Sequence, residues 1–389
     1  MNARTAAGVF VVACVAPLAC ISLGCASVIQ PRAPEPRPEV VRAPEPNRMV
    51  SGLGSATEPL KVSLVSFHGY APAFASNGGA LRTQPESIAD QYGVTVDYIM
   101  QDNVPTLTEI FTTGAAHCSW RTSDFWAQEQ PNLRRAGLDA RAVMVTANSR
   151  GADALITLDP SIQSVRDLVN KSVALLMFTP SHGLLLDAIE RSDLTPVERD
   201  AIDIRYINVD EGTSGVRAAL GARLVDAAFL WDPDASIAVR TMGARVVYST
   251  RAEVDRIFDV IVCDTRVLDN PANHPAISAL VAAWTDGVAA IRENPMRGVA
   301  ALVEANEFYQ QLAREHGRDF IAGLFSNLVL ADVAENRRVF GLDGGANHYA
   351  ASYRRFDRIY RRAGSLANPS SPVIDVSESV DLRFIRALR

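Results

Sequence analysis

Metal-binding cysteine and histidine motifs are missing from this chain of 389 residues. Its six histidines are dispersed and no Cys-x-x-Cys pair occurs, so neither a structural metal nor a cofactor is expected. Three of the five cysteines belong to the first 25 residues, which leaves Cys118 and Cys263 in the part with the composition of a folded protein. In an exported protein these two could form a disulfide or remain buried thiols, and the sequence leaves both alternatives open.

Clustered positive charge is also missing. The formal net charge is −6, and the basic residues are scattered apart from short, surface-like groups such as RRFDRIYRR at residues 354–362. A nucleic-acid partner is therefore not expected. No apolar run after the amino-terminal segment is long enough to span a membrane.

Catalytic signatures are missing as well. The sequence shows no Ser-His-Asp order, no paired carboxylates in a catalytic context and no glycine-rich phosphate loop, so we expect a protein without enzymatic activity. Hydrophobic residues make up 48% of the chain, which is enough to bury a substantial core. The length allows two domains or lobes.

The amino-terminal residues have the features of an export signal. Arg4 precedes an apolar run from Ala6 to Ile21, and the pair Gly24-Cys25 follows. A Gly-Cys pair at this place resembles the lipobox of bacterial lipoproteins, in which the cysteine becomes the lipidated first residue. Ser22 departs from that box, so cleavage by the general signal peptidase is the alternative. We expect a lipoprotein-type signal peptide over residues 1–25, with lipid on Cys25.

A stretch rich in proline and charge follows the predicted signal. Residues 30–47 read QPRAPEPRPEVVRAPEPN, a composition that cannot form a core and favours a stiff, extended conformation. We interpret residues 26–58 as a tether that holds the folded part away from a membrane, since a lipid anchor fixes one end only.

From Leu60 onward, strand-like and helix-like segments alternate, which predicts a largely parallel sheet covered by helices. Two extended segments, 142–149 and 153–158, are separated by only three residues, and we interpret this link as a crossing between two lobes. The predicted divisions are 59–148 for the first part of lobe 1, 149–257 for lobe 2, and 258–389 for the return to lobe 1 and a helical carboxy-terminal region.

Three motifs, in order and at similar spacing, resemble those of one known family. FHGYAP at residues 67–72 is similar to its G-Y-A-P opening, and FTPSH at 178–182 is similar to its turn into the second-lobe helix. DAAFLWDPD at 226–234 resembles its D-A-A-x-x-W-E-P segment, with Asp232 in place of Glu. The family is that of bacterial extracytoplasmic solute-binding proteins of ABC transporters, in the group for nitrate, sulfonates, taurine and thiamine precursors.

The resemblance covers residues 60–295 and implies a fold class. That class is the α/β, two-lobed periplasmic-binding-protein fold of the second type, with a helical carboxy-terminal region packed on the first lobe. In such sheets, ligands bind in the crevice outside the carboxyl ends of the strands.

Residues that follow the predicted strands are therefore the candidates for a ligand site. The rings of Tyr70, Trp120 and Trp231 are expected to line one cleft. Arg121, with Arg150 in reserve, would supply positive charge, and the helix start at Thr179 would offer free N–H groups to an anion. The expected ligand-binding residues are Gly69, Tyr70, Trp120, Arg121, Thr122, Ser123, Arg150, Thr179, Ser181, His182, Trp231 and Asp232.

The resemblance implies a lipid-anchored substrate-binding protein of an ABC importer, located in the periplasm and acting as a monomer with permease and ATPase subunits as partners. It would capture a small, anionic organic molecule or oxyanion by closure of its two lobes. One alternative is an envelope lipoprotein that senses the same ligand and signals to a partner. Another is an enzyme of the thiamine-pyrimidine or menaquinone type with this fold.

Overall fold

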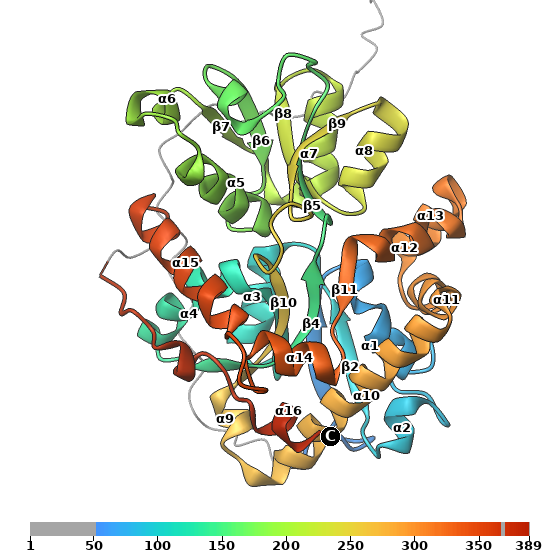
Figure 1. The fold of residues 1–389 in the computed structure, drawn as a ribbon. Coiled ribbons are helices and arrows are strands. Elements are labelled where there is room, and N and C mark those ends of the chain that lie inside the picture. The colour runs from blue at the N-terminus through green and yellow to red at the C-terminus, as the bar shows by residue number, and fades with distance from the viewer. Residues whose placement is uncertain (1–51, 367–369, 389) are drawn as a thin grey trace, which may run out of the picture.

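Alternating strands and helices build two α/β lobes, which the computed structural model describes for residues 52–366 and 370–388 (Figure 1). The sheet of the first lobe consists of β1 (Leu60–Leu64), β2 (Val96–Met100), β3 (Cys118–Thr122), β4 (Ala140–Ser149), β10 (Phe258–Asp264) and β11 (Leu328–Leu330). Their order is β11-β4-β10-β3-β1-β2. β1 is parallel to β2 and β3, whereas β10 is antiparallel to β3 and β4.

A second sheet forms the other lobe. It consists of β5 (Asp153–Thr157), β6 (Ser172–Leu175), β7 (Asp203–Tyr206), β8 (Ala227–Trp231) and β9 (Arg245–Ser249). Their order is β7-β6-β8-β5-β9, with β6 parallel to β7 and β8 and with β5 antiparallel to β8 and β9. The chain crosses between the lobes twice, from β4 to β5 through three residues and from β9 to β10 through residues 250–257.

Helices cover both sheets. Those of the second lobe are α5 (Pro180–Arg191), α6 (Pro196–Asp200), α7 (Gly212–Gly221) and α8 (Asp234–Met242). Those of the first half of the first lobe are α1 (Ala71–Ser76), α2 (Ile88–Gln91), α3 (Val104–Thr112) and α4 (Ser123–Arg135). After β10 come α9 (Thr265–Leu268), α10 (His274–Glu293), α11 (Pro295–Ala305), α12 (Glu307–His316), α13 (Arg318–Leu324), α14 (Val333–Val339), α15 (His348–Arg362) and α16 (Arg383–Ala387). None of the helices in the described ranges is long and apolar enough to span a membrane.

Cys118 and Cys263 form a disulfide. The two residues face each other on the paired strands β3 and β10, with their Cα atoms 4.0 Å apart. Both side chains are buried in the core of the first lobe. The structure thus decides between the two alternatives that the sequence left open.

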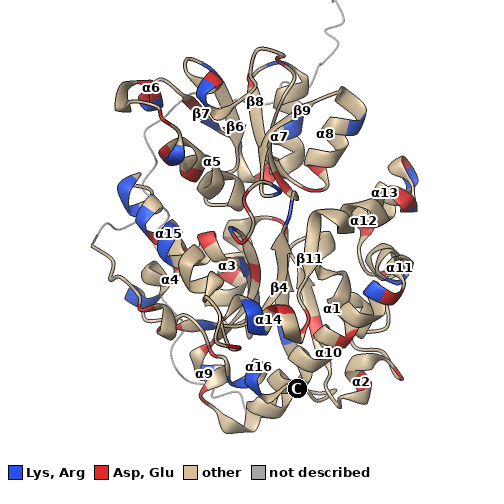
Figure 2. Cartoon of the chain, viewed as in Figure 1, with Lys and Arg blue, Asp and Glu red and all other residues tan. Residues whose placement is uncertain are grey.

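α15 joins the two lobes on one side. One face of α15 is aromatic and buried, and its residues recur at helical spacing: Tyr349, Tyr353, Phe356 and Tyr360. The arginines of the same helix are its blue segments in Figure 2. The buried face packs against α4 of the first lobe and α5 of the second. One hydrophobic cluster therefore runs through both lobes, and it includes Trp126 of α4 together with residues of α5 and α15.

The two-lobed α/β architecture expected from the sequence is confirmed. The expectation of a largely parallel sheet is wrong, because β10, which returns the chain to the first lobe, and β5, which enters the second, run antiparallel to their neighbours, so both sheets are mixed. The carboxy-terminal region adds one feature to that expectation. Helices α10 and α11 pack on α1 of the first lobe as expected, whereas α15 contacts the second lobe as well. The reason is its apolar face, which is long enough to cover both α4 and α5.

Candidate ligand-binding site

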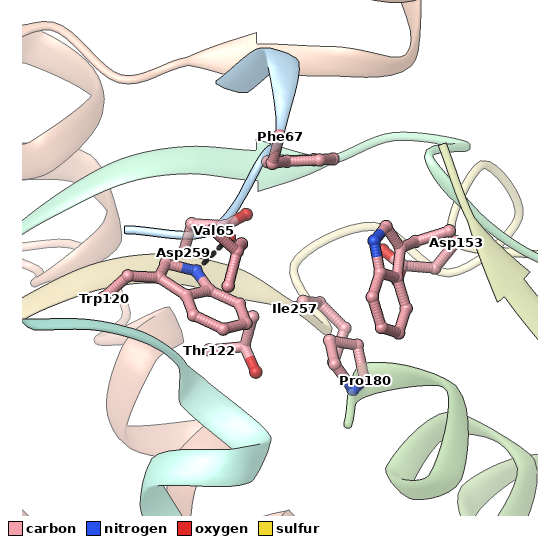
Figure 3. A pocket seen from close by; sticks show the side chains of 9 residues that line it. Val65, Phe67, Trp120, Thr122, Asp153, Pro180, Ile257 and Asp259 are labelled. Carbon is pink, nitrogen blue, oxygen red and sulfur yellow. Dashed lines mark hydrogen bonds between the residues drawn. The ribbon is translucent and has the colours of Figure 1, made fainter. Parts of the chain in front are cut away.

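A small cavity lies where the chain leaves β1, β3 and β8 and enters α5, between the two lobes. Its volume is about 20 Å³, enough for roughly one water molecule. Trp120 and Pro180 lie on opposite sides of it, with Thr122 between them (Figure 3). The lining residues are Val65, Phe67, Trp120, Thr122, Asp153, Pro180, Trp231, Ile257 and Asp259.

Strand alternation decides which residues of β3 reach this cavity. Successive side chains of a strand point to opposite faces, so Trp120 and Thr122 line the cavity while Ser119 and Arg121 point away from it. From the sequence, the strand HCSW would end at Trp120, so Trp120 through Ser123 were expected to lie together in the loop that follows it. β3 continues to Thr122, and α4 begins at Ser123.

Arg121 is consequently not a residue of the cavity. Its side chain is fully buried and pairs with Glu129 of α4 through both Nε and Nη2. Its Nη1 donates to Ser119 Oγ over 2.7 Å and to the carbonyl oxygen of Trp120. Its guanidinium also lies over the rings of Phe111 and Phe125. The first lobe thus satisfies this cation internally.

Trp120 is fixed by a buried carboxylate. Its Nε1 donates to Asp259 Oδ1 over 2.8 Å (Figure 3). The hydroxyl of Tyr70 donates to the same oxygen over 2.7 Å. Tyr70 is itself fully buried and packs edge-on against Trp120. Tyr70 therefore supports the cavity from behind, and Asp259 orients the indole ring that lines it.

Two further carboxyl groups stand at the junction of the lobes. Asp153, at the start of β5, accepts a hydrogen bond from Ser149 Oγ at its Oδ2 over 2.6 Å. Asp232 accepts the backbone N–H of Ser236 and, across the lobes, the side-chain amide of Asn327. Asp153 lines the cavity, whereas Asp232 caps α8 and contacts the first lobe next to Trp231.

The start of α5 has a carboxylate from the other lobe beside it. A Cβ atom on Gly183 would come within 2.6 Å of Asp124 Oδ2 and 2.9 Å of the Tyr360 hydroxyl, so this glycine allows the close approach of α4, α5 and α15. The backbone carbonyl of Thr179 accepts the N–H groups of His182 and Gly183. The hydroxyl of Thr179 donates to the carbonyl oxygen of Leu176. The chain's own Asp124 therefore lies beside the helix start that was expected to receive an anion.

The remaining predicted residues are not among those that line the cavity. His182 packs against Tyr206 and Tyr360, and Ser123 Oγ contacts Ser352 Oγ of α15 over 2.8 Å. Arg150 pairs with Asp255 in the second crossing. Gly69 lies so close to the Phe67 ring that a side chain would not fit. Ser181 Oγ is buried without a hydrogen-bond partner in the described part of the chain.

The structure thus brings Trp120, Thr122 and Trp231 together and places Tyr70 and Asp232 directly behind them. The sequence analysis missed the two lining carboxyls, Asp153 and Asp259, and the ring of Phe67. A signal was present, because an aspartate inside an apolar strand such as FDVIVCD is seldom buried without a specific role.

Burial perturbs the acid groups around the cavity. It raises the pKa of Asp124, Asp232 and Asp259 from 3.8 to about 6, and it raises the pKa of Asp153 well above its ordinary range. Burial is the largest cause for all four groups, and the neighbouring carboxyls raise the pKa of Asp153 further. The low-dielectric site disfavours the charged form of each group.

We expect the unliganded protein to be more stable at about pH 5 than at about pH 7.5, if other groups are constant. The folded state retains protons that the unfolded chain releases above pH 3.8, so this stability is present at low pH and is lost as the pH rises through about 6. Between pH 5 and pH 7.5, one carboxyl whose pKa is raised from 3.8 to about 6 contributes about 1.4 kcal/mol to this difference. Urea unfolding across this range measures it, and Asp259→Asn should flatten the pH dependence. If the free energy of unfolding of Asp259→Asn depended on pH as strongly as that of the wild type, the raised pKa of Asp259 would be contradicted.

No family model and no curated protein matches the sequence. Solved structures do match. The periplasmic aliphatic sulphonate-binding protein SsuA from Escherichia coli has 17% identity and a TM-score of 0.62, with 83% of this chain and 97% of that chain covered. The alkanesulfonate-binding SsuA from Xanthomonas axonopodis pv. citri, bound to MOPS, has 14% identity and a TM-score of 0.62, with 83% and 98% covered.

An enzyme is also among the similar structures. The desulfurization enzyme DSZB has 15% identity and a TM-score of 0.54, with 84% of this chain and 97% of that chain covered. At such low sequence identities, the structural similarity establishes the fold, whereas the function must be argued from the residues of the site. The chain has the periplasmic-binding-protein fold that its sequence motifs predicted.

Proposed function

We propose that this protein is the solute-binding component of an ABC importer and holds a small organic molecule between its lobes. The observation that supports this most is the meeting of Trp120 and Trp231, from different lobes, at one cavity beside the carboxyl ends of β3 and β8. Ligands of open α/β sheets bind at that position, and aromatic rings supply much of the contact area. The sulfonate-binding proteins of similar structure are consistent with this role.

Binding requires movement, because the cavity of about 20 Å³ is far smaller than the roughly 300–1,000 Å³ of typical ligand pockets. We propose that the lobes separate about the two crossings and close again on the ligand. Permease and ATPase subunits are the partners that this role implies.

Trp231→Ala is expected to weaken ligand binding by about 30-fold or more, since a buried aromatic anchor usually contributes at least 2 kcal/mol. The ligand is first identified by native mass spectrometry of the purified protein and by a thermal-shift screen of small organic ions and neutral compounds. Calorimetry then compares the wild type with Trp231→Ala and with the conservative variant Trp231→Phe. Equal affinity in all three proteins would argue against this site.

The ligand charge expected from the sequence is not favoured by this site. An anionic ligand was expected because Arg121 would supply positive charge and the start of α5 would supply free N–H groups. Arg121 instead pairs with Glu129, and Asp124 lies beside the first turn of α5. The charged side chains that line the cavity are Asp153 and Asp259.

We further propose that the protein is exported to the periplasm and anchored by lipid on Cys25. This residue and the Pro-rich tether lie outside the described residues, so the proposal depends on the sequence pattern Gly24-Cys25 after an apolar run. Labelling with radioactive palmitate in a bacterial host should mark the wild-type protein and not Cys25→Ser. Recovery of an unlabelled wild-type protein with a different amino terminus would contradict the anchor.

A further inference from the structure

The cavity at the junction of the lobes has an acidic lining. Asp153 and Asp259 line the cavity, and Asp124 and Asp232 are buried close to it. Figure 2 shows acidic and basic segments side by side where the lobes meet, and the arginines there have partners of their own, Arg150 with Asp255 and Arg251 with Asn327. No basic residue is among the nine that line the cavity. Burial disfavours the charged form of each of these carboxyls, and a bound positive charge would favour that form.

The hydrogen-bonding capacity of the cavity is mainly that of an acceptor. Asp259 receives both of its side-chain hydrogen bonds at Oδ1, and Asp153 receives that of Ser149 at Oδ2. The second oxygen of each carboxyl is thus available to a donor on a ligand. The N–H of Trp120 is already donated to Asp259, and Pro180 has no N–H to offer.

A hydroxyl also lies in the lining. Thr122 is buried between Trp120 and Pro180 on the wall of the cavity (Figure 3). Its side chain lies beside the buried carboxyl of Asp124, and its hydrogen bonding partly offsets the rise that burial causes in the pKa of that carboxyl. The chain therefore supplies a polar neighbour for this hydroxyl, and the carboxyls of Asp153 and Asp259 are the polar groups on which recognition of a ligand would depend.

Aromatic rings complete the lining. Trp120, Trp231 and Phe67 come from three different segments, and Asp259 holds the Trp120 ring in place. The face of an aromatic ring attracts a cation, and it does so most strongly for tryptophan in a desolvated site. Carboxylates and indole faces around one small space are a combination that recognises positive charge and repels anions.

We infer that the ligand is a small organic cation, an alkylammonium compound whose charged nitrogen lies between Asp153 and Asp259 and against the ring of Trp120. This inference depends on the proposed function, because it names the ligand class of the same cavity. The apolar residues Val65 and Ile257 would contact the alkyl part of such a molecule. The class is opposite in charge to the sulfonates that the similar proteins are named for.

The experiment is calorimetry at about pH 7.5 with three matched sets of compounds. The cations are propylammonium, tetramethylammonium and choline; the neutral compounds are butan-1-ol and 3,3-dimethylbutan-1-ol, the isostere of choline; the anions are propanesulfonate and butyrate. We expect at least one cation to bind one to one, and about 100-fold more tightly than its neutral counterpart. Asp259→Asn and Asp153→Asn should each weaken cation binding at least about tenfold and narrow the difference in affinity between a cation and its neutral counterpart.

These variants should fold, because each replaces a buried acid by a neutral side chain of the same shape; circular dichroism checks this. Tighter binding of an anion or a neutral compound than of its matched cation would overturn the inference and leave the proposed function intact. If no compound of the three classes binds, and native mass spectrometry finds no small molecule on the purified protein, both the inference and the proposed function fail.

Discussion

Replacing Glu129 by alanine is expected to lower the free energy of unfolding by about 3–5 kcal/mol, because the variant leaves the guanidinium of Arg121 buried without its partner. Arg121 has no solvent exposure, and Glu129 is the only carboxylate with which it pairs among the described residues. The neutral acceptors Ser119 and Thr108 remain, but they cannot compensate the charge. Urea unfolding followed by circular dichroism measures the loss.

Two comparisons make this test specific to burial. The pair Arg82–Asp97 is partly exposed to solvent, so Asp97→Ala should cost less than about 1 kcal/mol. The double variant Arg121→Met with Glu129→Leu should recover much of the loss, since it removes both charges and keeps apolar volume. If Glu129→Ala and Asp97→Ala had equally small effects, Arg121 would be free to serve a ligand, as the sequence first suggested.

The error about Arg121 shows how far the sequence determines the site. The motif around Trp120 correctly predicted a strand that reaches the cavity, but not the residue at which the strand ends. Its neighbours were placed there by proximity along the chain alone. Because β3 continues for two more residues, the period of two turns Arg121 to the opposite face, where Glu129 of the following helix meets it.

The strands themselves were largely predictable. FDVIVCD was expected to return the chain to the first lobe, and β10 spans the same residues, Phe258–Asp264. AAFLW corresponds to β8. The role of Asp259 could not be read in this way, because it depends on Tyr70, which is distant in the sequence and meets Asp259 only after the sheet has formed.

The basic segment RRFDRIYRR was interpreted as a short surface group, and Arg354, Arg358 and Arg362 are indeed exposed, whereas Asp357 is buried. Its apolar positions were overlooked. Tyr349, Tyr353, Phe356 and Tyr360 follow helical spacing, which would have indicated a buried face. That the face covers both lobes depends on Gly183, whose missing side chain lets α15 approach α5. No local pattern reveals such a contact.

Replacing Phe356 by alanine is expected to destabilise the protein by about 3–5 kcal/mol, as large cavities in a core do. Phe356 is fully buried and belongs to the cluster that includes α4 and α5, so the variant removes contacts in both lobes. The pairing of Arg355 with the buried Asp187 of α5 adds a charged contact beside it. We therefore expect wild-type urea unfolding to show one cooperative transition, with a lower midpoint in Phe356→Ala.

The matched control is Arg358→Ala on the exposed side of the same helix, which keeps the helix and should change the free energy of unfolding by less than about 0.5 kcal/mol. A loss below about 1 kcal/mol in Phe356→Ala would mean that α15 does not contribute to a common core. Two separate wild-type transitions would mean that the lobes are independent. A common core on the α15 side would restrict the lobes to separating on the opposite side, near α8 and α13, where Arg240 lies over the ring of Phe320.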